Sequence, residues 1–323
     1  MPEYTLPVID LIGAPFDLGG QRLGSRMGPA AARLAGLAET LRSLGCAVKD
    51  RGDLTQPQAE PGAMGRKVYP SAYVALKEVR SSVEDSLALD SVPLVIGGDH
   101  TVSIGSVGAA LSKYGTDLAV LWVDAHSDLN TPGTSDSGNI HGMPVAALMG
   151  LESGVDGEQE ILWRRIMAEV VGAEKLGAER AAWLGLREVD GPEQEQLAQM
   201  PGCFTSTMYD LDRNGLVSEI DRLDAWTRES GASQLWISFD VDVLDPILAP
   251  GTGTAVRGGL TYREMHLMGE MLSETMRAPG CPYRLAGLDL VEINPLFDRG
   301  NETAKTAVEW IASIFGKTIL GKR

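Results

Sequence analysis

The chain has 323 residues, of which 44% are hydrophobic and 22% charged, values typical of a globular protein with a sizeable core. Its formal net charge of −16 argues against a nucleic-acid partner, because neutralising phosphates requires clustered Lys and Arg. The sequence has no run of about 18 apolar residues, so we expect no membrane span.

Short apolar runs alternate along the chain with longer segments of helical period. The predicted strands are 5–13, 46–51, 92–97, 118–124, 181–186, 203–207, 234–240 and 284–292. The predicted helices include 29–44, 71–88, 101–113, 261–276 and 302–315. This alternation indicates βαβ units, and therefore an α/β fold with a mainly parallel sheet and helices on both faces. Because no repeat or long linker divides the chain, we predict one domain over 1–323.

Asp and His residues gather after three of the predicted strands. They are His100 after the third strand, Asp124, His126 and Asp128 after the fourth, and Asp240 and Asp242 after the seventh. Ligands of parallel sheets bind beyond the carboxyl ends of the strands. In an extended chain, residues two apart point the same way, so each set is expected to converge on one side.

Four carboxylates at short range would repel one another, and two divalent cations would cancel their charge. Oxygen ligands with one imidazole per ion favour Mn²⁺, with Zn²⁺, Co²⁺ and Fe²⁺ as alternatives. A lone Asp-x-His is more often a cap or a solvated loop. However, three of the four histidines (His100, His126 and His141) lie in these segments, so their joint occurrence indicates a metal site. The fourth, His266, lies in a helical stretch and is expected to be structural.

These segments also resemble those of a known family. GGDHTVSIGS, DAHSDLN, SGNIHGMP, SFDVDVLDP, APGTGT, GGLTYRE and VEINP, in this order from 97 to 295, resemble the arginase/agmatinase ureohydrolases. IGAPFDLGG and GPAAAR extend the resemblance to nearly the whole chain. It implies a three-layer fold with about eight parallel strands and two Mn²⁺ per chain. It also implies a hydrolase of arginine metabolism that cleaves L-arginine to L-ornithine and urea through a metal-bridging hydroxide, and a homotrimer or homohexamer.

The resemblance assigns a role to each residue of the cluster. One Mn²⁺ would bind His100, Asp124, Asp128 and Asp240, and the other Asp124, His126, Asp240 and Asp242. His141 would pass a proton to the leaving amine, because its ordinary pKa lies nearest the working pH. Glu292 would accept two hydrogen bonds from the guanidinium group. Asp99, Asp245 and Asp289 would orient these groups.

The resemblance further implies that the substrate-binding residues are Asn130, Ser135, Ser137, Asn139, Asp190, Glu193 and Thr254. Asn130, Ser135 and Ser137 would hydrogen-bond the α-carboxylate of arginine. Asp190 would bind its α-amine, with Glu193 acting through water. The chain departs from many arginases at Val243, where glycine is common, and at Ala255, where proline is common. A branched side chain at Val243 could reshape the metal rim or the pocket wall.

Other functions remain open at this point. The same chemistry would serve guanidinobutyrate, agmatine or N-hydroxyarginine. A single-zinc deacetylase-like amidohydrolase or a non-catalytic relative would need fewer metal ligands, so the full set of six argues against both. Three scattered cysteines indicate a reducing compartment, so we expect a cytoplasmic enzyme with a small guanidino substrate and without nucleic-acid or membrane partners.

Overall fold

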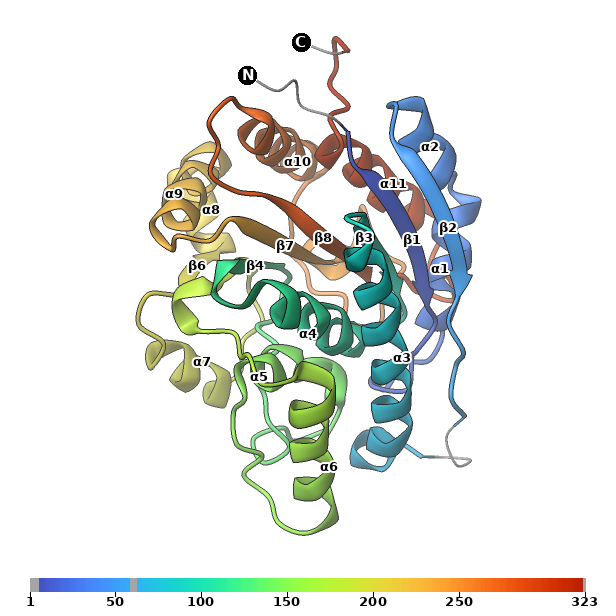
Figure 1. The fold of residues 1–323 in the computed structure, drawn as a ribbon, viewed down its shortest axis with the longest axis vertical. Coiled ribbons are helices and arrows are strands. Elements are labelled where there is room, and N and C mark those ends of the chain that lie inside the picture. Colours follow the sequence, from blue (N-terminus) through green and yellow to red (C-terminus); the bar gives the residue numbers. More distant parts are fainter. Residues whose placement is uncertain (1–5, 59–62, 322–323) are drawn as a thin grey trace.

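The computed structural model describes residues 6–58 and 63–321 and contains one eight-stranded sheet (Figure 1). The strand order is β2-β1-β3-β8-β7-β4-β5-β6, and every neighbouring pair is parallel. The strands are β1 (Val8–Ala14), β2 (Ala47–Asp53), β3 (Val92–Gly97), β4 (Leu118–Val123), β5 (Ala181–Leu186), β6 (Phe204–Thr207), β7 (Gln234–Asp240) and β8 (Arg284–Val291). The predicted α/β class is confirmed.

The strand bounds agree with the predicted ones to within a few residues. The first strand, predicted over 5–13, begins at Val8, and residue 5 lies outside the described residues. Every residue of β3 and of β4 is buried, because helices cover both faces of the sheet. Such strands are apolar throughout, which is why they stand out in the sequence.

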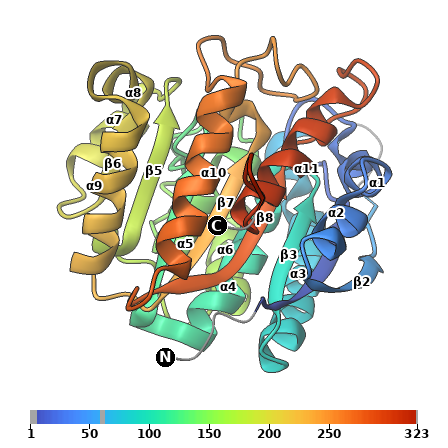
Figure 2. The same cartoon turned by 90° about the horizontal axis from the view of Figure 1, so that it is seen from above.

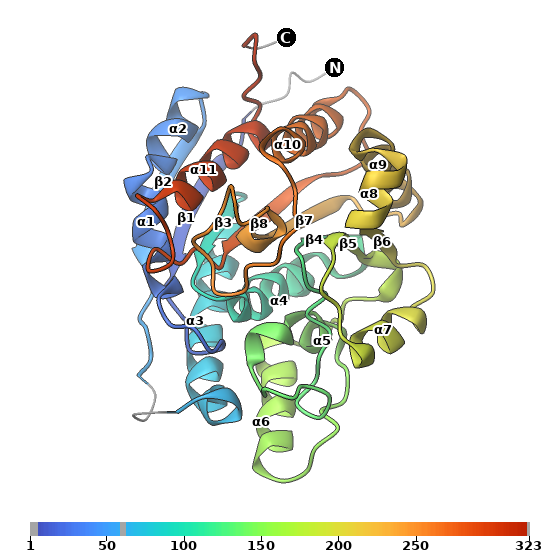
Figure 3. The same cartoon turned by 180° about the vertical axis from the view of Figure 1, so that it is seen from behind.

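The helices form two layers, one on each face of the sheet (Figures 1 to 3). One layer holds α1 (Gly28–Leu34), α2 (Leu37–Ser43), α8 (Met208–Asn214), α9 (Leu216–Glu229), α10 (Tyr262–Arg277) and α11 (Glu302–Ile314). The other holds α3 (Tyr69–Ala88), α4 (Ser103–Tyr114), α5 (Pro144–Met149), α6 (Glu158–Ile166) and α7 (Gly191–Ala198). This sandwich is the three-layer arrangement that the sequence predicts.

The predicted helix 29–44 is wrong as a single element. The structure divides it into α1 and α2, because Gly36 adopts a left-handed conformation with φ of 82°. The predicted helix 101–113 begins instead with a 3₁₀ turn, η3 (His100–Val102), which precedes α4. The side chain of Asp99 caps η3 by accepting a hydrogen bond from Thr101 N at 3.1 Å. This short turn fixes where His100 leaves the sheet.

None of the helices that the structure describes is long and apolar enough to cross a membrane.

Candidate metal centre

The predicted metal ligands come from strands that are close neighbours in the sheet. His100 follows β3, Asp124 follows β4, and Asp240 ends β7, while Glu292 follows β8. These four strands stand in the order β3-β8-β7-β4 at the centre of the sheet. In Figure 2 the arrowheads of β3 and β5 point toward the top of the view, which marks the carboxyl edge. The topology therefore gathers the side chains at that edge.

His100 lies against three carboxylates. Its Nδ1 atom is 3.0 Å from Asp124 Oδ2 and 3.2 Å from both Asp128 Oδ2 and Asp240 Oδ2. His126 forms a second group, with Nδ1 at 3.1 Å from Asp242 Oδ2 and 3.4 Å from Asp124 Oδ1. His100, Asp124 and Asp240 form one group that could hold a metal ion, and Asp124, His126 and Asp242 form another, so Asp124 belongs to both. The six residues predicted as ligands are thus brought together.

The donor atoms of this cluster fit a cation. Neither His100 Nδ1 nor Asp128 Oδ2 meets hydrogen-bond geometry in the part of the chain that the structure describes, although both are buried. His100 Nε2 lies 2.9 Å from Ser238 Oγ, so a ring that donates there presents the lone pair of Nδ1 to the carboxylates. Facing lone pairs repel one another unless a positive charge lies between them. Imidazole nitrogens and carboxylate oxygens are ligands that divalent metals accept.

The electrostatics of the cluster agree with this geometry. Burial and the negative charge of Asp124 raise the pKa of Asp128 well above its ordinary value. Burial and the charges of Asp242 and Asp124 do the same to the pKa of Asp240. The protein alone therefore leaves the crowded carboxylates incompletely compensated, and divalent cations would supply the missing positive charge.

A buried chain of contacts orients His100. Ser238 Oγ contacts Asp289 Oδ2 at 3.2 Å, and Trp236 Nε1 donates to the same oxygen at 3.0 Å. The His100 ring also stacks on Trp122, with centroids 4.0 Å apart and an interplanar angle of 8°. Asp289 thus acts on His100 through Ser238, which agrees with its predicted orienting role.

Hydrogen bonds to three segments hold Asp242 in place. Its backbone N–H donates to Asp240 Oδ1 at 2.8 Å within the turn η8 (Val241–Val243). Its Oδ1 accepts from Ala125 N at 3.2 Å, and its Oδ2 accepts from Thr254 Oγ1 at 2.6 Å. Thr254 was predicted to bind substrate, and in the structure its hydroxyl donates to Asp242, a predicted metal ligand.

Glu292 and His141 form a pair beside the cluster. Glu292 Oε1 lies 2.9 Å from His141 Nδ1 and accepts a hydrogen bond from His100 N at 3.0 Å. Glu292 has φ of 64°, an uncommon left-handed conformation that aims its side chain inward. Burial lowers the pKa of His141, but the hydrogen bond with Glu292 and the negative charges of Glu292, Asp99 and Asp128 together outweigh burial and raise that pKa to about 9.

These side chains line a cavity of about 310 Å³. Asn130, Asp190, Glu193 and Thr254, all predicted to bind substrate, line it as well. Asn130 Nδ2 donates to Asp190 Oδ2 at 2.8 Å. The Glu193 carboxylate accepts from Leu129 N and Asp190 N, both at 3.1 Å, so it also holds the cavity wall in place.

The other predicted substrate residues lie elsewhere. Ser137 and Asn139 line a different cavity, of about 340 Å³, together with Arg66 and Lys67. Ser135 is buried, and its hydroxyl accepts a hydrogen bond from Gly138 N at 3.0 Å. The structure does not bring these three side chains into the cavity that the candidate metal ligands line.

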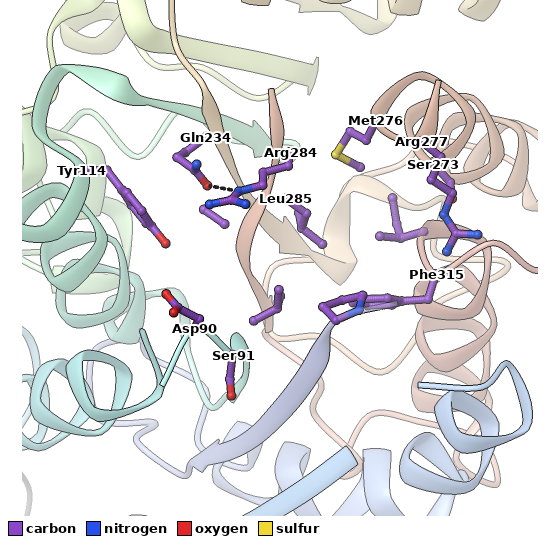
Figure 4. A pocket seen from close by; sticks show the side chains of 14 residues that line it. Asp90, Ser91, Tyr114, Gln234, Ser273, Met276, Arg277, Arg284, Leu285 and Phe315 are labelled. Carbon is purple, nitrogen blue, oxygen red and sulfur yellow. Dashed lines mark hydrogen bonds between the residues drawn. The ribbon is translucent and has the colours of Figure 1, made fainter. Parts of the chain in front are cut away.

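A larger cavity, of about 410 Å³, opens at the opposite edge of the sheet (Figure 4). It lies at the amino ends of β3, β7 and β8, where Arg284 contacts Gln234. None of the predicted site residues lines it. We therefore assign the chemistry to the smaller cavity at the carboxyl edge.

The structure also shows where Val243 and Ala255, which differ from many arginases, and Asp245, a predicted orienting residue, lie. Val243 is fully buried and packs toward Gly185, so it does not form the wall of the cavity that the candidate metal ligands line. Ala255 is exposed and does not line it either. Asp245 accepts from Ile247 N and Gly258 N, so it stabilises a loop, and no hydrogen bond joins it to a ligand side chain in the described residues.

Three residues of this region were not predicted from the sequence. Glu188 lines the metal cavity, Ser238 contacts His100, and Arg187 binds the turn that carries Asp242. Arg187 and Glu188 lie three and two residues before Asp190 in the motif GLREVDGPE, so their position close to a predicted site residue was the one available signal. Ser238 lies within a buried strand, where a serine gives no sign of its partner.

The fold and the site define an α/β protein with a metal-ligating cluster at the carboxyl edge of a parallel sheet. The model of the arginase family matches residues 8–316. An arginase from Staphylococcus aureus (strain COL) is 37% identical over 317 residues, which cover 97% of this chain and 98% of the relative. The chain therefore belongs to the arginase family and is a ureohydrolase, as the resemblance predicted.

Other relatives agree with this assignment. An arginase from Bacillus subtilis (strain 168) is 37% identical over 314 residues, covering 97% of this chain and 99% of the relative. The native structure of an arginase from Bacillus caldovelox superposes with a TM-score of 0.87 at 35% identity, covering 97% and 100% of the two chains. The expected eight-stranded fold is thus shared with solved arginases.

Proposed function

We propose that this ureohydrolase cleaves L-arginine to L-ornithine and urea with two Mn²⁺ ions. The observation that carries the proposal is the convergence of two metal-ligating groups and the Glu292–His141 pair in one cavity. The relatives named arginase support the substrate. The mainly oxygen donor set with one imidazole per group supports manganese.

His100, Asp124, Asp128 and Asp240 would hold one ion, and Asp124, His126, Asp240 and Asp242 the other. Bound there, the two ions lower the pKa of water, so that hydroxide becomes available near neutral pH. Asp124 suits a bridging position, because its two oxygens face different histidines. The buried Trp122 donates to Asp124 Oδ2 at 3.1 Å and limits how that carboxylate can turn.

Glu292 binds the guanidinium group of the substrate in this proposal. Its Oε1 already accepts from His100 N, which fixes the carboxylate, and Oε2 has no hydrogen bond in the described residues. A planar cation with paired N–H donors matches a carboxylate held in this way. The guanidinium carbon is thereby kept beside the metal ligands.

His141 gives a proton to the departing amine. The hydrogen bond with Glu292 favours the imidazolium form, so a proton is present at neutral pH. The ring is mostly buried within the cavity wall, which positions the proton without exposing it to bulk water. A general acid placed in this way contributes about 10²- to 10⁴-fold to a rate.

We assign recognition of the far end of arginine to polar residues that line the same cavity as the candidate metal ligands. Asp190 is exposed at the cavity and would accept hydrogen bonds from the α-amine, and Asn130 would donate to the α-carboxylate. Ser135, Ser137 and Asn139 would reach the carboxylate after the loop 130–142 adjusts. Their present location favours a second candidate, a guanidino substrate without the α-carboxylate, such as agmatine.

Urea release decides between these substrates. The Mn²⁺-loaded protein should be assayed with L-arginine, agmatine, guanidinobutyrate and N-hydroxyarginine. Each buried polar group without a partner costs about 1–3 kcal/mol, so we expect kcat/KM for L-arginine to exceed that for agmatine by at least about tenfold. Preferred turnover of agmatine would reverse the substrate assignment. Absence of urea from every compound by fully loaded protein would overturn the proposed activity.

We further propose that residues 1–323 form a single domain, that the enzyme is a cytoplasmic homotrimer or homohexamer, and that it uses no nucleic-acid or membrane partner. All eight strands of the described residues belong to one sheet, which supports a single domain. Sedimentation velocity of the Mn²⁺-loaded protein would give the oligomeric state, and a monomeric mass would contradict the assembly.

A further inference from the structure

The guanidinium group of Arg187 lies in a ring of backbone carbonyls. Its Nη2 donates to Asp242 O at 2.5 Å, to Val256 O at 2.9 Å and to Leu244 O at 3.4 Å. Its Nη1 donates to Val243 O at 3.2 Å. One side chain at the end of β5 thus binds successive carbonyls of the turn that carries Asp242, together with the loop that carries Thr254.

The backbone of Arg187 reaches the other ligand-bearing segment. The N–H groups of Arg187 and Glu188 donate to Ala125 O at 2.9 and 3.0 Å. Ala125 stands between Asp124 and His126, and its own N–H donates to Asp242 Oδ1 at 3.2 Å. Arg187 therefore connects both segments whose side chains form the His126 group.

The carbonyl ring leaves the charge of Arg187 available to the cluster. In the described residues no carboxylate forms an ion pair with it, and its Nε has no hydrogen-bond partner. Burial lowers the pKa of Arg187, and the negative charges of Asp242 and Asp124 oppose that effect. A positive charge here competes with a cation for the same carboxylates, so Arg187 supports metal binding through the hydrogen bonds that hold the turn η8 and not through its charge.

We infer that Arg187 is a positioning residue that sets the affinity of the divalent cation held by Asp124, His126 and Asp242. This inference rests on the proposed metal site and names a determinant of it outside the ligands. Loss of the Arg187 hydrogen bonds frees the turn η8 and the loop that carries Thr254, so the distance between Asp242 and His126 is no longer fixed. The His100 group depends on η3 and Ser238, which Arg187 does not contact, so it is affected less.

Arg180 provides a matched control. It lies just before the amino end of the same strand, β5, and is more deeply buried than Arg187. Its guanidinium likewise donates to backbone carbonyls, to Gly115 O at 3.0 Å and to Lys175 O at 3.4 Å. Neither acceptor belongs to a segment that carries a predicted metal ligand. Substitution of Arg180 therefore reports the structural effect of removing a buried arginine from this strand.

The test is a stepwise Mn²⁺ titration, followed by calorimetry and electron paramagnetic resonance, of metal-free wild type, R187K, R187Q, R180K and R180Q. Groups that orient ligands typically change metal affinity by about 10- to 100-fold. We expect R187K to weaken one of the two binding steps to this extent and R187Q to weaken it further. Lysine keeps the charge but lacks the fork that spans several carbonyls. Activity per fully loaded enzyme should largely return in R187K at saturating Mn²⁺.

Combination with ligand variants identifies the affected ion. If Arg187 acts on the His126 group, the effects of R187K and H126N on Mn²⁺ affinity are non-additive, whereas those of R187K and H100N add. Two Mn²⁺ bound by R187K with wild-type affinities would overturn the inference, as would equal losses in R180K and R187K. Failure of wild type itself to bind two ions would instead contradict the proposed function.

Discussion

His141 is the residue whose proposed role is most directly separable from metal binding. It contacts Glu292 and belongs to neither metal-ligating group. In H141N, kcat for urea release should fall by about 10²- to 10⁴-fold, because the leaving amine loses its proton donor. Bound Mn²⁺, measured by elemental analysis, should stay at the wild-type level. H266N is the control and should keep its kcat. A kcat within a few-fold of wild type in H141N would contradict the proton-transfer role.

His266 has a structural place and gives a pH-dependent prediction. Its Nδ1 lies 2.8 Å from Ser313 Oγ, which joins α10 to α11. Burial lowers the pKa of His266 below the ordinary value of 6.5, so the folded protein favours the neutral ring. This contribution to stability is present above pH 6.5 and is lost as the pH falls through the folded pKa.

Urea denaturation of Mn²⁺-loaded wild type and H266Q between pH 8 and pH 5 tests this sign. The wild-type free energy of unfolding should exceed that of H266Q by less at pH 5 than at pH 8. The remaining histidines are common to both proteins, so their titration largely cancels in the difference. A difference that stays constant or grows toward pH 5 would show that His266 does not contribute in this way.

At the scale of elements, the contact between β5 and η8 explains why Val243 is tolerated. Gly185 has φ of 100°, and a Cβ there would lie 2.4 Å from Val243 Cγ2. The valine fills the space over a glycine, away from the substrate. Truncation should therefore leave a void in the core rather than widen the active site.

V243A should lower the free energy of unfolding by about 1–3 kcal/mol, as expected for a lost buried branched side chain. KM for L-arginine at saturating Mn²⁺ should change by less than about twofold, since Val243 does not line the cavity. Chemical denaturation and steady-state kinetics measure the two effects. A large change in KM with unchanged stability would place Val243 in the substrate pocket after all.

The site shows which parts of an element the sequence can predict. Asp124, His126 and Asp128 were expected to converge because alternate residues of a strand point the same way. However, β4 ends at Val123, and Asp128 has φ of 53°, so a turn rather than strand geometry directs it. The residue types after each strand were readable from sequence. The backbone conformation that aims them was not, because a left-handed aspartate has no distinct local pattern.

Contacts between residues on different strands could not be predicted from the sequence either. Ser238 and Arg187 act on ligands that are distant in sequence, and their partners become clear once β3, β7 and β5 are arranged in space. The capping box of Asp190 and Glu193 was readable in principle, because its spacing is local. The sequence motifs predicted the candidate ligands, whereas the residues that hold those ligands in place became visible only in the fold.

At the scale of the whole molecule, the strand order makes the stability of the fold depend on the proposed metal centre. The alternation of strands and helices predicted a parallel sheet, but not the order β3-β8-β7-β4 that collects the ligands at its middle. Pairing depends on long-range packing, which a single sequence does not reveal. The consequence is that mutually repelling carboxylates stand at the centre of the fold, where they oppose folding until cations compensate them.

Removal of metal should therefore destabilise the entire protein. Ions that bind the folded chain and not the unfolded one stabilise it by RT ln(1 + [L]/Kd), about 2.7 kcal/mol per ion at a hundredfold excess over Kd. Two ions at the proposed centre would raise the melting temperature by several degrees, in proportion to the logarithm of free Mn²⁺. Scanning calorimetry of chelator-treated, dialysed protein with increasing Mn²⁺ measures this. In D128N, which loses a ligand of one ion, the gain should be smaller, whereas in R180K it should match wild type. A melting temperature that does not respond to Mn²⁺ would contradict a metal centre built into the core of the sheet.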